Sequence, residues 1–191
     1  MNAYLMLMAG WAIYFALHSV FASDAVKQFF KQSMPAVSRF YRIIYNVIFT
    51  LSLLVMLVLN ASIPSAYLIE PSSWTRYFSL MLATVGIFIF RAAFRQYDSR
   101  GFMGLRDDEQ EVFKAGGILK KVRHPIYLAT LFIVAGFWLF IPNVTTLVSA
   151  GCILVYLAIG IPLEERKLIR KYGDAYRKYK KDVPALIPRF W

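Results

Sequence analysis

Cysteine, histidine and charged residues are all scarce in this chain. Its 191 residues include one cysteine, Cys152, so a disulfide framework is excluded. Because Cys152 lies within an apolar run, we interpret it as a buried and inert thiol. The two histidines have no usable cysteine partner with which to form a typical zinc site, and we expect no metal.

Charged residues make up 17% of the chain and hydrophobic residues 59%. This composition is too apolar for a soluble fold of this size, and it predicts a single integral membrane domain over residues 1–191. We expect a front half of three helices (1–96) and a back half (97–191) with a loop, a helical hairpin and a C-terminal tail.

Five apolar runs cover residues 3–22, 43–63, 77–94, 126–141 and 144–163. At the helical rise of 1.5 Å, runs of roughly 16 to 21 residues span about 24 to 32 Å, which matches the hydrocarbon core of a bilayer. The predicted fold class is therefore all-α, a polytopic membrane bundle of about five transmembrane helices. The first run has no basic segment before it and no small-residue cleavage site, so we expect a retained helix rather than a signal peptide.

Lysine and arginine are distributed unevenly between the connections. Twenty of the 22 lie in segments 23–42, 95–125 and 164–191, whereas the alternate connections contain only Arg76. This asymmetry predicts an N-terminus outside and a C-terminus in the cytoplasm, across the inner membrane if the protein is bacterial. The net charge of +11 then reflects topology and attraction to anionic lipid, and we expect no nucleic-acid partner.

The last two apolar runs are separated by Pro142 and Asn143, which predict a two-residue turn and a tight helical hairpin. Such a hairpin brings His124, before the fourth run, beside Glu164 and Glu165, after the fifth. Ionisable groups at the membrane surface are costly unless they face a pocket or a partner. We therefore expect a functional site on this water-facing edge.

The tail beyond the fifth run is amphipathic. Gly173 followed by Asp174 predicts the end of one helix and the start of another. Apolar residues recur at helical spacing at Leu168, Tyr172, Tyr176 and Tyr179. We expect a cytoplasmic amphipathic segment in the headgroup layer, which either anchors the protein or forms a flap over the site.

Several of these motifs together resemble a known family. RHPIY at 123–127, the hairpin, the paired glutamates and KYGDAYRKYKKDVPALIP at 171–188 resemble the membrane methyltransferases related to isoprenylcysteine carboxyl methyltransferase and phospholipid methyltransferase. LHSVFAS at 17–23, YRIIYN at 41–46 and YDSRGFMGLR at 97–106 are similar to the subgroup of NnrU-like proteins and methanethiol S-methyltransferase. The resemblance implies methyl transfer to a small thiol or lipidic acceptor at the cytoplasmic face.

The resemblance also implies S-adenosyl-L-methionine as the cofactor. This molecule needs a carboxylate for its amino group, donors for its own carboxylate and an apolar slot for adenine. Glu164 matches the cofactor glutamate of the family, with Glu165 beside it. The other matches to cofactor-binding positions are Glu111, Val112, Phe113, Lys114, Leu119, His124, Pro125, Ile126 and Tyr127. The helix that begins near Pro125 would also offer free N–H groups to a carboxylate.

A structural interpretation of the same residues remains open. In it, Arg123 extends its charge to the water, and Glu164 and Glu165 pair along the helix with Lys167 and Lys171.

A thiol acceptor must lose its proton before it attacks, and the candidate catalytic bases are His124 and His18. We favour His124 as a cofactor partner rather than as the base. The candidate substrate residues are polar groups near the inner ends of the first three helices: Asn46, Arg91, Arg95 and Asp98.

Two positions depart from the family pattern. Gly160 stands where the prenylcysteine enzymes have a substrate-binding arginine, so a carboxylate acceptor is disfavoured. Ala129 replaces a usual glycine, and its methyl group would alter the local packing.

Two other functions are considered. The back half also resembles sterol reductases, which would imply an NADPH-dependent membrane reductase. A non-catalytic membrane subunit is the third alternative. Since the chain has no soluble Rossmann fingerprint, any cofactor must be held by the helical bundle itself.

Overall fold

The computed structural model describes residues 2–38, 40–96 and 115–188, and this part of the chain is almost entirely helical. In chain order the elements are α1 (Ala3–Ala22), α2 (Asp24–Ser33), α3 (Pro35–Ser38), α4 (Tyr41–Ser62), α5 (Ser73–Phe94), the 3-10 turn η1 (Gly117–Lys120), α7 (Pro125–Phe140), α8 (Val144–Tyr172) and α9 (Asp174–Asp182). The predicted all-α fold is confirmed.

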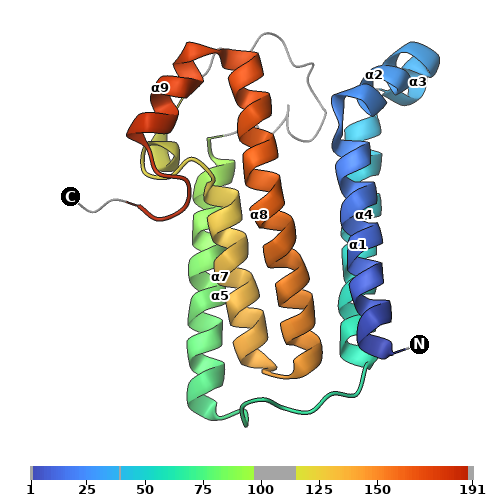
Figure 1. Ribbon diagram of the computed structural model, residues 1–191, viewed down its shortest axis with the longest axis vertical. Coiled ribbons are helices and arrows are strands. Elements are labelled where there is room, and N and C mark those ends of the chain that lie inside the picture. Colours follow the sequence, from blue (N-terminus) through green and yellow to red (C-terminus); the bar gives the residue numbers. More distant parts are fainter. Residues whose placement is uncertain (1, 39, 97–114, 189–191) are drawn as a thin grey trace.

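The long helices lie side by side in one elongated bundle (Figure 1). α5 packs along α7, α7 packs against α8, and α8 contacts both α1 and α4. The short helices α2, α3 and α9 lie at one end of the bundle, and the beginning of α1 lies at the other (Figure 1). This arrangement places the last turns of α8 and the start of α7 at the same end.

Four of the described helices, α1, α4, α5 and α8, are long and apolar enough to cross a membrane. α7 is a shorter apolar helix of 16 residues that lies between α5 and α8. Large apolar side chains such as Leu51, Val58 and Phe88 are more than half exposed, as expected for a surface that faces lipid. The chain is therefore an integral membrane protein whose bundle follows the five predicted apolar runs.

Local sequence signals explain where the helices begin. Ser72 and Thr75 form a reciprocal capping box at α5, and the Asn143 side chain accepts a hydrogen bond from the Thr146 N–H at α8. Pro125 occupies the first turn of α7, where a missing N–H is tolerated. The predicted tight α7–α8 hairpin is confirmed, although its connection has three residues, Ile141, Pro142 and Asn143, instead of two.

Glycine allows α5 and α7 to approach closely. A Cβ atom at Gly136 would lie 2.7 Å from the backbone oxygen of Ser79, and one at Gly86 would lie 2.8 Å from that of Ala129. Small residues at such contacts let membrane helices pack backbone to backbone. α5 is therefore packed closely against the α7 side of the α7–α8 hairpin.

A buried polar chain joins α1, α4 and α8. The indole Nε1 of Trp11 donates to Ser149 Oγ at 2.8 Å, and Ser149 Oγ donates to Asn60 Oδ1 at 2.7 Å. Through such hydrogen bonds between helices, polar side chains buried away from water find partners, and the bonds fix how the helices pack. They hold α1 beside the hairpin.

The end of α8 differs from the prediction. The apolar run ends at Leu163, but the helix continues through Pro162 and a charged stretch to Tyr172, and it ends at Gly173. Gly173 has a φ of 57°, which favours glycine, and α9 begins at the next residue. The predicted break is confirmed, whereas residues 164–172 extend the membrane helix instead of forming a separate surface segment.

Candidate functional site

The functional residues predicted around the hairpin form one compact cluster. His124 caps the start of α7, and Glu164 and Glu165 lie on α8. The Nδ1 atom of His124 lies 3.7 Å from Glu164 Oε2, and its Nε2 atom lies 3.2 Å from Glu165 Oε1. The predicted proximity of the histidine and the two glutamates is confirmed. We call Arg123, His124, Glu164, Glu165 and Lys180 the carboxylate cluster.

Glu165 is the buried centre of this cluster. Its Oε1 atom accepts hydrogen bonds from Arg123 Nε at 2.9 Å and Nη2 at 2.6 Å, while its Oε2 atom pairs with Lys180 Nζ at 2.5 Å. The side chain is only 7% exposed. A buried carboxylate needs such partners. Since Arg123 lies just before α7 and Lys180 lies on α9, Glu165 links the start of α7 and α9 to its own helix, α8.

The electrostatics of Glu165 follow from these contacts. Burial acts to raise the pKa of its carboxyl group, but hydrogen bonds from Lys180, Arg123 and His124 outweigh burial and lower this pKa from 4.5 to about 2. Glu165 lies beyond the apolar run of α8, at the water-facing end of the helix. The group is therefore a firmly ionised anchor.

Arg123 ties the C-terminal tail to the same place. Its Nη1 atom donates to the backbone oxygens of Lys180, at 2.8 Å, and of Val183. Its backbone N–H donates to the Pro184 oxygen, and that of His124 donates to the Ala185 oxygen. Since the Arg123 side chain is 9% exposed, the alternative in which it extends freely to water is wrong.

Glu164 differs from its neighbour. Its side chain is 41% exposed, and within the part of the chain that the structure describes its ion-pair contact is with His124. Glu165 has its oxygens occupied by protein groups, whereas Glu164 has a carboxylate that can still meet a ligand. Of the two predicted cofactor glutamates, the geometry favours Glu164 for binding and Glu165 for structure.

The N-terminus of α7 provides the complementary donors. The first turn of a helix leaves its N–H groups without helical partners. Here Pro125 has none, and the N–H of His124 is taken by the tail. The N–H group of Ile126 remains at the start of the helix, so part of the predicted donor set is retained.

The loop before α7 contributes one described residue of the predicted set. Leu119 lies in η1, and its backbone oxygen accepts a hydrogen bond from the Tyr179 hydroxyl at 2.5 Å. This contact adds a further tie between the loop and α9. Glu111, Val112, Phe113 and Lys114 lie outside the described residues, as does Asp98.

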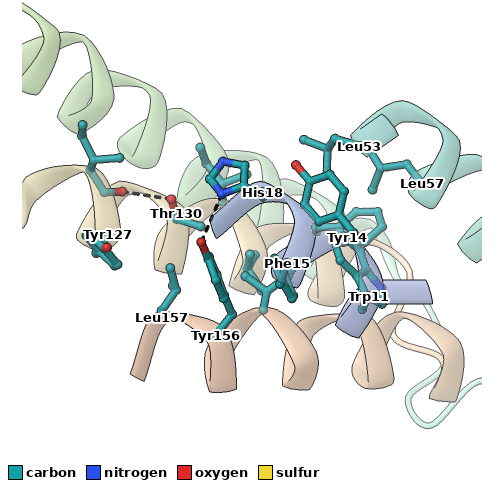
Figure 2. Close-up of a pocket in the computed structure, with 15 residues that line it drawn as sticks. Trp11, Tyr14, Phe15, His18, Leu53, Leu57, Tyr127, Thr130, Tyr156 and Leu157 are labelled. Atoms are coloured by element: carbon teal, nitrogen blue, oxygen red, sulfur yellow. Dashed lines mark hydrogen bonds between the residues drawn. The ribbon is translucent and has the colours of Figure 1, made fainter. Parts of the chain in front are cut away.

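A half-open cavity of about 540 Å³ lies between the helices, and Tyr127, three residues after His124, is part of its lining. Its walls are side chains of α1, α4, α7 and α8 (Figure 2). Its lining includes Trp11, His18, Leu53, Tyr127, Thr130 and Tyr156. Ile126 also lines it, so two residues of the predicted cofactor tetrad face the cavity.

His18 contributes an imidazole to this cavity. Its Nδ1 atom lies 3.1 Å from the hydroxyl of Tyr156, a contact marked in Figure 2. The same hydroxyl lies 3.1 Å from Ser19 Oγ. The candidate base His18 and the candidate base His124 are thus in different environments: the first lines an apolar cavity, and the second lies between carboxylates.

One face of α8 connects the two places. Tyr156, Gly160 and Glu164 recur every four residues, so they follow the same side of the helix. A Cβ atom at Gly160 would lie 3.2 Å from the Tyr127 hydroxyl, which therefore lies across that glycine. The absence of a side chain at Gly160 makes room for the tyrosine.

Three of the predicted substrate residues, Asn46, Arg91 and Arg95, lie in the described part of the chain. Asn46 is half-buried on α4, and Arg91 and Arg95 are exposed on or beside the end of α5. None of the three lines the cavity. Their role in binding an acceptor stays a prediction.

Sequence reasoning missed Tyr156 and Lys180. Tyr156 lies in a wholly apolar run, where its hydroxyl was the one available signal. Lys180 belongs to a tail rich in basic residues, and nothing in the pattern distinguishes it from its neighbours. Only the fold of the tail shows which lysine returns to Glu165.

Comparison with protein families gives one match over most of the chain. A family model described as "NnrU protein" matches residues 6–188. No solved structure shows significant similarity to the chain.

Several relatives are named as methyltransferases. The chain is 50% identical over 78 residues to Methanethiol S-methyltransferase 1 of Bradyrhizobium diazoefficiens, which covers 40% of this chain and 26% of that protein. It is 28% identical to Methanethiol S-methyltransferase 2 of the same organism, over 98% of this chain and 73% of that protein. It is also 34% identical over 73 residues to Protein-S-isoprenylcysteine O-methyltransferase of Schizosaccharomyces pombe, over 38% of this chain and 31% of that protein. The first and third matches thus span less than a third of those relatives.

Proposed function

Because the chain belongs to the NnrU protein family, whose model matches residues 6–188, we propose that it is an integral membrane methyltransferase. The proposed reaction transfers a methyl group from S-adenosylmethionine to a thiol. The relatives named as methanethiol S-methyltransferases support the reaction class. They also favour methyl transfer over the NADPH-dependent reductase and over a non-catalytic subunit.

The observation that carries the proposal is the pairing of His124 with a half-exposed Glu164 at 3.7 Å, beside the start of α7. This donor set suits a zwitterion. Glu164 would hold the amino group, and the N–H group of Ile126 would meet the carboxylate with the positive end of the helix dipole behind it. The residues present therefore fit S-adenosylmethionine.

Bound there, S-adenosylmethionine supplies a methyl group attached to a sulfonium sulfur. The protein contributes position and a dry environment. Glu165 and Arg123 fix the tail against the start of α7, so the backbone segment 183–185 covers one side of the carboxylate cluster. His124 is held between the two glutamates and keeps Glu164 oriented.

The basic end of the bundle sets the proposed orientation. Of the described Lys and Arg residues outside the long apolar stretches, nearly all lie at the end that carries α2, α9 and the end of α8 (Figure 1). This end would face the cytoplasm, with the start of α1 on the other side. The carboxylate cluster would then have access to cytoplasmic S-adenosylmethionine.

A methyl-transfer assay tests the proposal. Purified protein in lipid nanodiscs is incubated with S-adenosylmethionine labelled on its methyl group and, separately, with alkyl thiols, alcohols and phospholipids. We expect labelled methyl thioethers from the thiols, and at least a tenfold lower rate for Glu164→Gln. If no thiol product carries the label and the protein instead oxidises NADPH, the proposal is wrong and the protein is a reductase.

A further inference from the structure

We propose that the cavity between α1, α4, α7 and α8 is the acceptor site, that it takes a thiol with an extended alkyl chain, and that His18 removes the thiol proton. This inference rests on the methyl transfer proposed above and names its acceptor class and its base.

The size and lining of the cavity define the acceptor. At about 540 Å³ it falls in the range of sites that enclose a whole small organic ligand, and a one-carbon thiol would leave most of it empty. Most of the wall is aliphatic or aromatic, including Trp11 and Leu53. An alkyl chain can fill such a space at membrane depth without leaving a polar group unpaired.

His18 and Tyr156 provide the polar end of the cavity. The groups that contact the His18 ring are Tyr14 on its own helix, Tyr45 and Phe49 on α4, and Tyr156 on α8. Tyr127 and Thr130 of α7 line the same cavity. These are uncharged side chains, so within the described residues no carboxylate competes with a thiol for the imidazole.

The hydrogen bond of Nδ1 to Tyr156 leaves the second ring nitrogen available. In the tautomer that carries its proton on Nδ1, this N–H donates to the Tyr156 hydroxyl, and Nε2 has a lone pair for the thiol proton. No hydrogen bond to Nε2 is present among the described residues. His124 lacks this property because both its nitrogens face glutamates.

One face of α8 runs from the cavity toward the carboxylate cluster. Eight residues of α8 separate Tyr156 from Glu164, which corresponds to a rise of about 12 Å. Gly160 lies midway on the same face, with the Tyr127 hydroxyl across it. Tyr127 thus borders both the cavity and the start of α7, where the methyl donor would bind.

The thiol proton passes to Nε2 of His18, and the thiolate sulfur forms a bond to the methyl carbon. The bond from this carbon to the sulfonium sulfur breaks, and its electron pair stays on that sulfur. The products are a methyl thioether and S-adenosylhomocysteine, and the proton leaves His18 for water before the next cycle.

Acceptor size is tested with a matched pair of variants on α4. Leu53 lines the cavity and is 36% exposed, whereas its neighbour Leu54 is 52% exposed and does not line the cavity. We expect kcat/KM to rise from ethanethiol to decanethiol in the wild type. Leu53→Trp should lower kcat/KM for decanethiol at least tenfold more than for ethanethiol, and Leu54→Trp should change neither more than twofold. Equal effects of the two variants, or a flat chain-length series, would overturn the acceptor assignment.

The base is tested by acceptor acidity. Removing a general base typically costs about 100-fold or more. His18→Gln should lower kcat by about this factor with an alkyl thiol, but by less than fivefold with an aromatic thiol, which is largely ionised near neutral pH. Tyr156→Phe should give a smaller loss with the same dependence on acidity. The same loss for both thiols would overturn the role of His18 as base.

Cofactor binding separates this inference from the proposed function. S-adenosylhomocysteine affinity, measured by calorimetry, should stay within twofold of wild type in His18→Gln, which also shows that the variant is folded. If the wild type binds the cofactor and methylates thiols while His18→Gln behaves like wild type, the inference fails and the methyltransferase stands. If the wild type neither binds the cofactor nor methylates any thiol, both fail.

Discussion

The Nδ1 atom of His124 lies 3.7 Å from Oε2 of Glu164, so the first turn of α7 and the charged end of α8 meet at one place. The short hairpin connection makes the two helices antiparallel, and the extension of α8 beyond its apolar run raises the glutamates to the level of the histidine. This contact joins a ligand-accessible carboxylate to the residues that hold the tail.

Glu165→Ala is expected to destabilise the protein by about 3 kcal/mol, because it leaves the buried Arg123 charge without its partner. Thermal unfolding in detergent measures the effect. Trypsin should also cleave faster after Lys180 and Lys181, since the tail loses its anchor. Glu164→Ala is the control, and equal stability of the two variants would contradict the structural role of Glu165.

Acid should release the same anchor. The pKa of Glu165 is about 2 in the folded protein, below its ordinary value of 4.5. A lowered pKa contributes stability that is fully present above 4.5 and is lost as the pH falls toward 2. The difference in melting temperature between wild type and Glu165→Gln should therefore shrink across this window. A difference that stays constant down to pH 2 would show that the carboxylate is not held as described.

Bulk at Gly160 should disturb the site through Tyr127. A Cβ atom there already approaches the Tyr127 hydroxyl to 3.2 Å, so Gly160→Val should displace the ring and lower kcat/KM about tenfold. Gly151→Val is the control on the same helix, because its Cβ would meet nothing within 4 Å. Steady-state kinetics on both variants decides, and equal activities would show that this contact does not shape the site.

The buried polar chain between α1 and α8 should contribute to stability. Ser149→Ala removes the partner of both Trp11 and Asn60, and we expect a loss of about 1 kcal/mol. Unfolding in mixed detergent micelles measures it. Ser52→Ala, which removes only a bond to the backbone of its own helix, should cost much less. A larger loss of stability for Ser52→Ala than for Ser149→Ala would mean that the hydrogen bonds of Ser149 do not hold α1.

The sequence predicted the long apolar helices well, because a bilayer imposes length and apolarity on each of them, but it did not predict the short helices α2 and α3. It also predicted the meeting of His124 with Glu164, since a short connection at Pro142 and Asn143 makes the two helices antiparallel. The end of α8 was missed because hydropathy marks where the lipid ends, and a charged helix such as 164–172 can continue into water.

The different environments of Glu164 and Glu165 could not be predicted from the sequence. Glu164 and Glu165 are chemically identical neighbours, and helical rotation alone turns one toward Arg123 and leaves the other half-exposed. The cavity was equally hidden, because Trp11, His18, Leu53 and Tyr156 come from three helices whose packing no local pattern specifies.

Equilibrium binding of S-adenosylmethionine to wild type and to Glu164→Gln, measured by calorimetry in nanodiscs, tests the central claim most directly. The account predicts that the wild type binds and that the variant binds at least tenfold more weakly with unchanged thermal stability. Equal affinity of the two proteins, or no binding by a folded wild type, would contradict it.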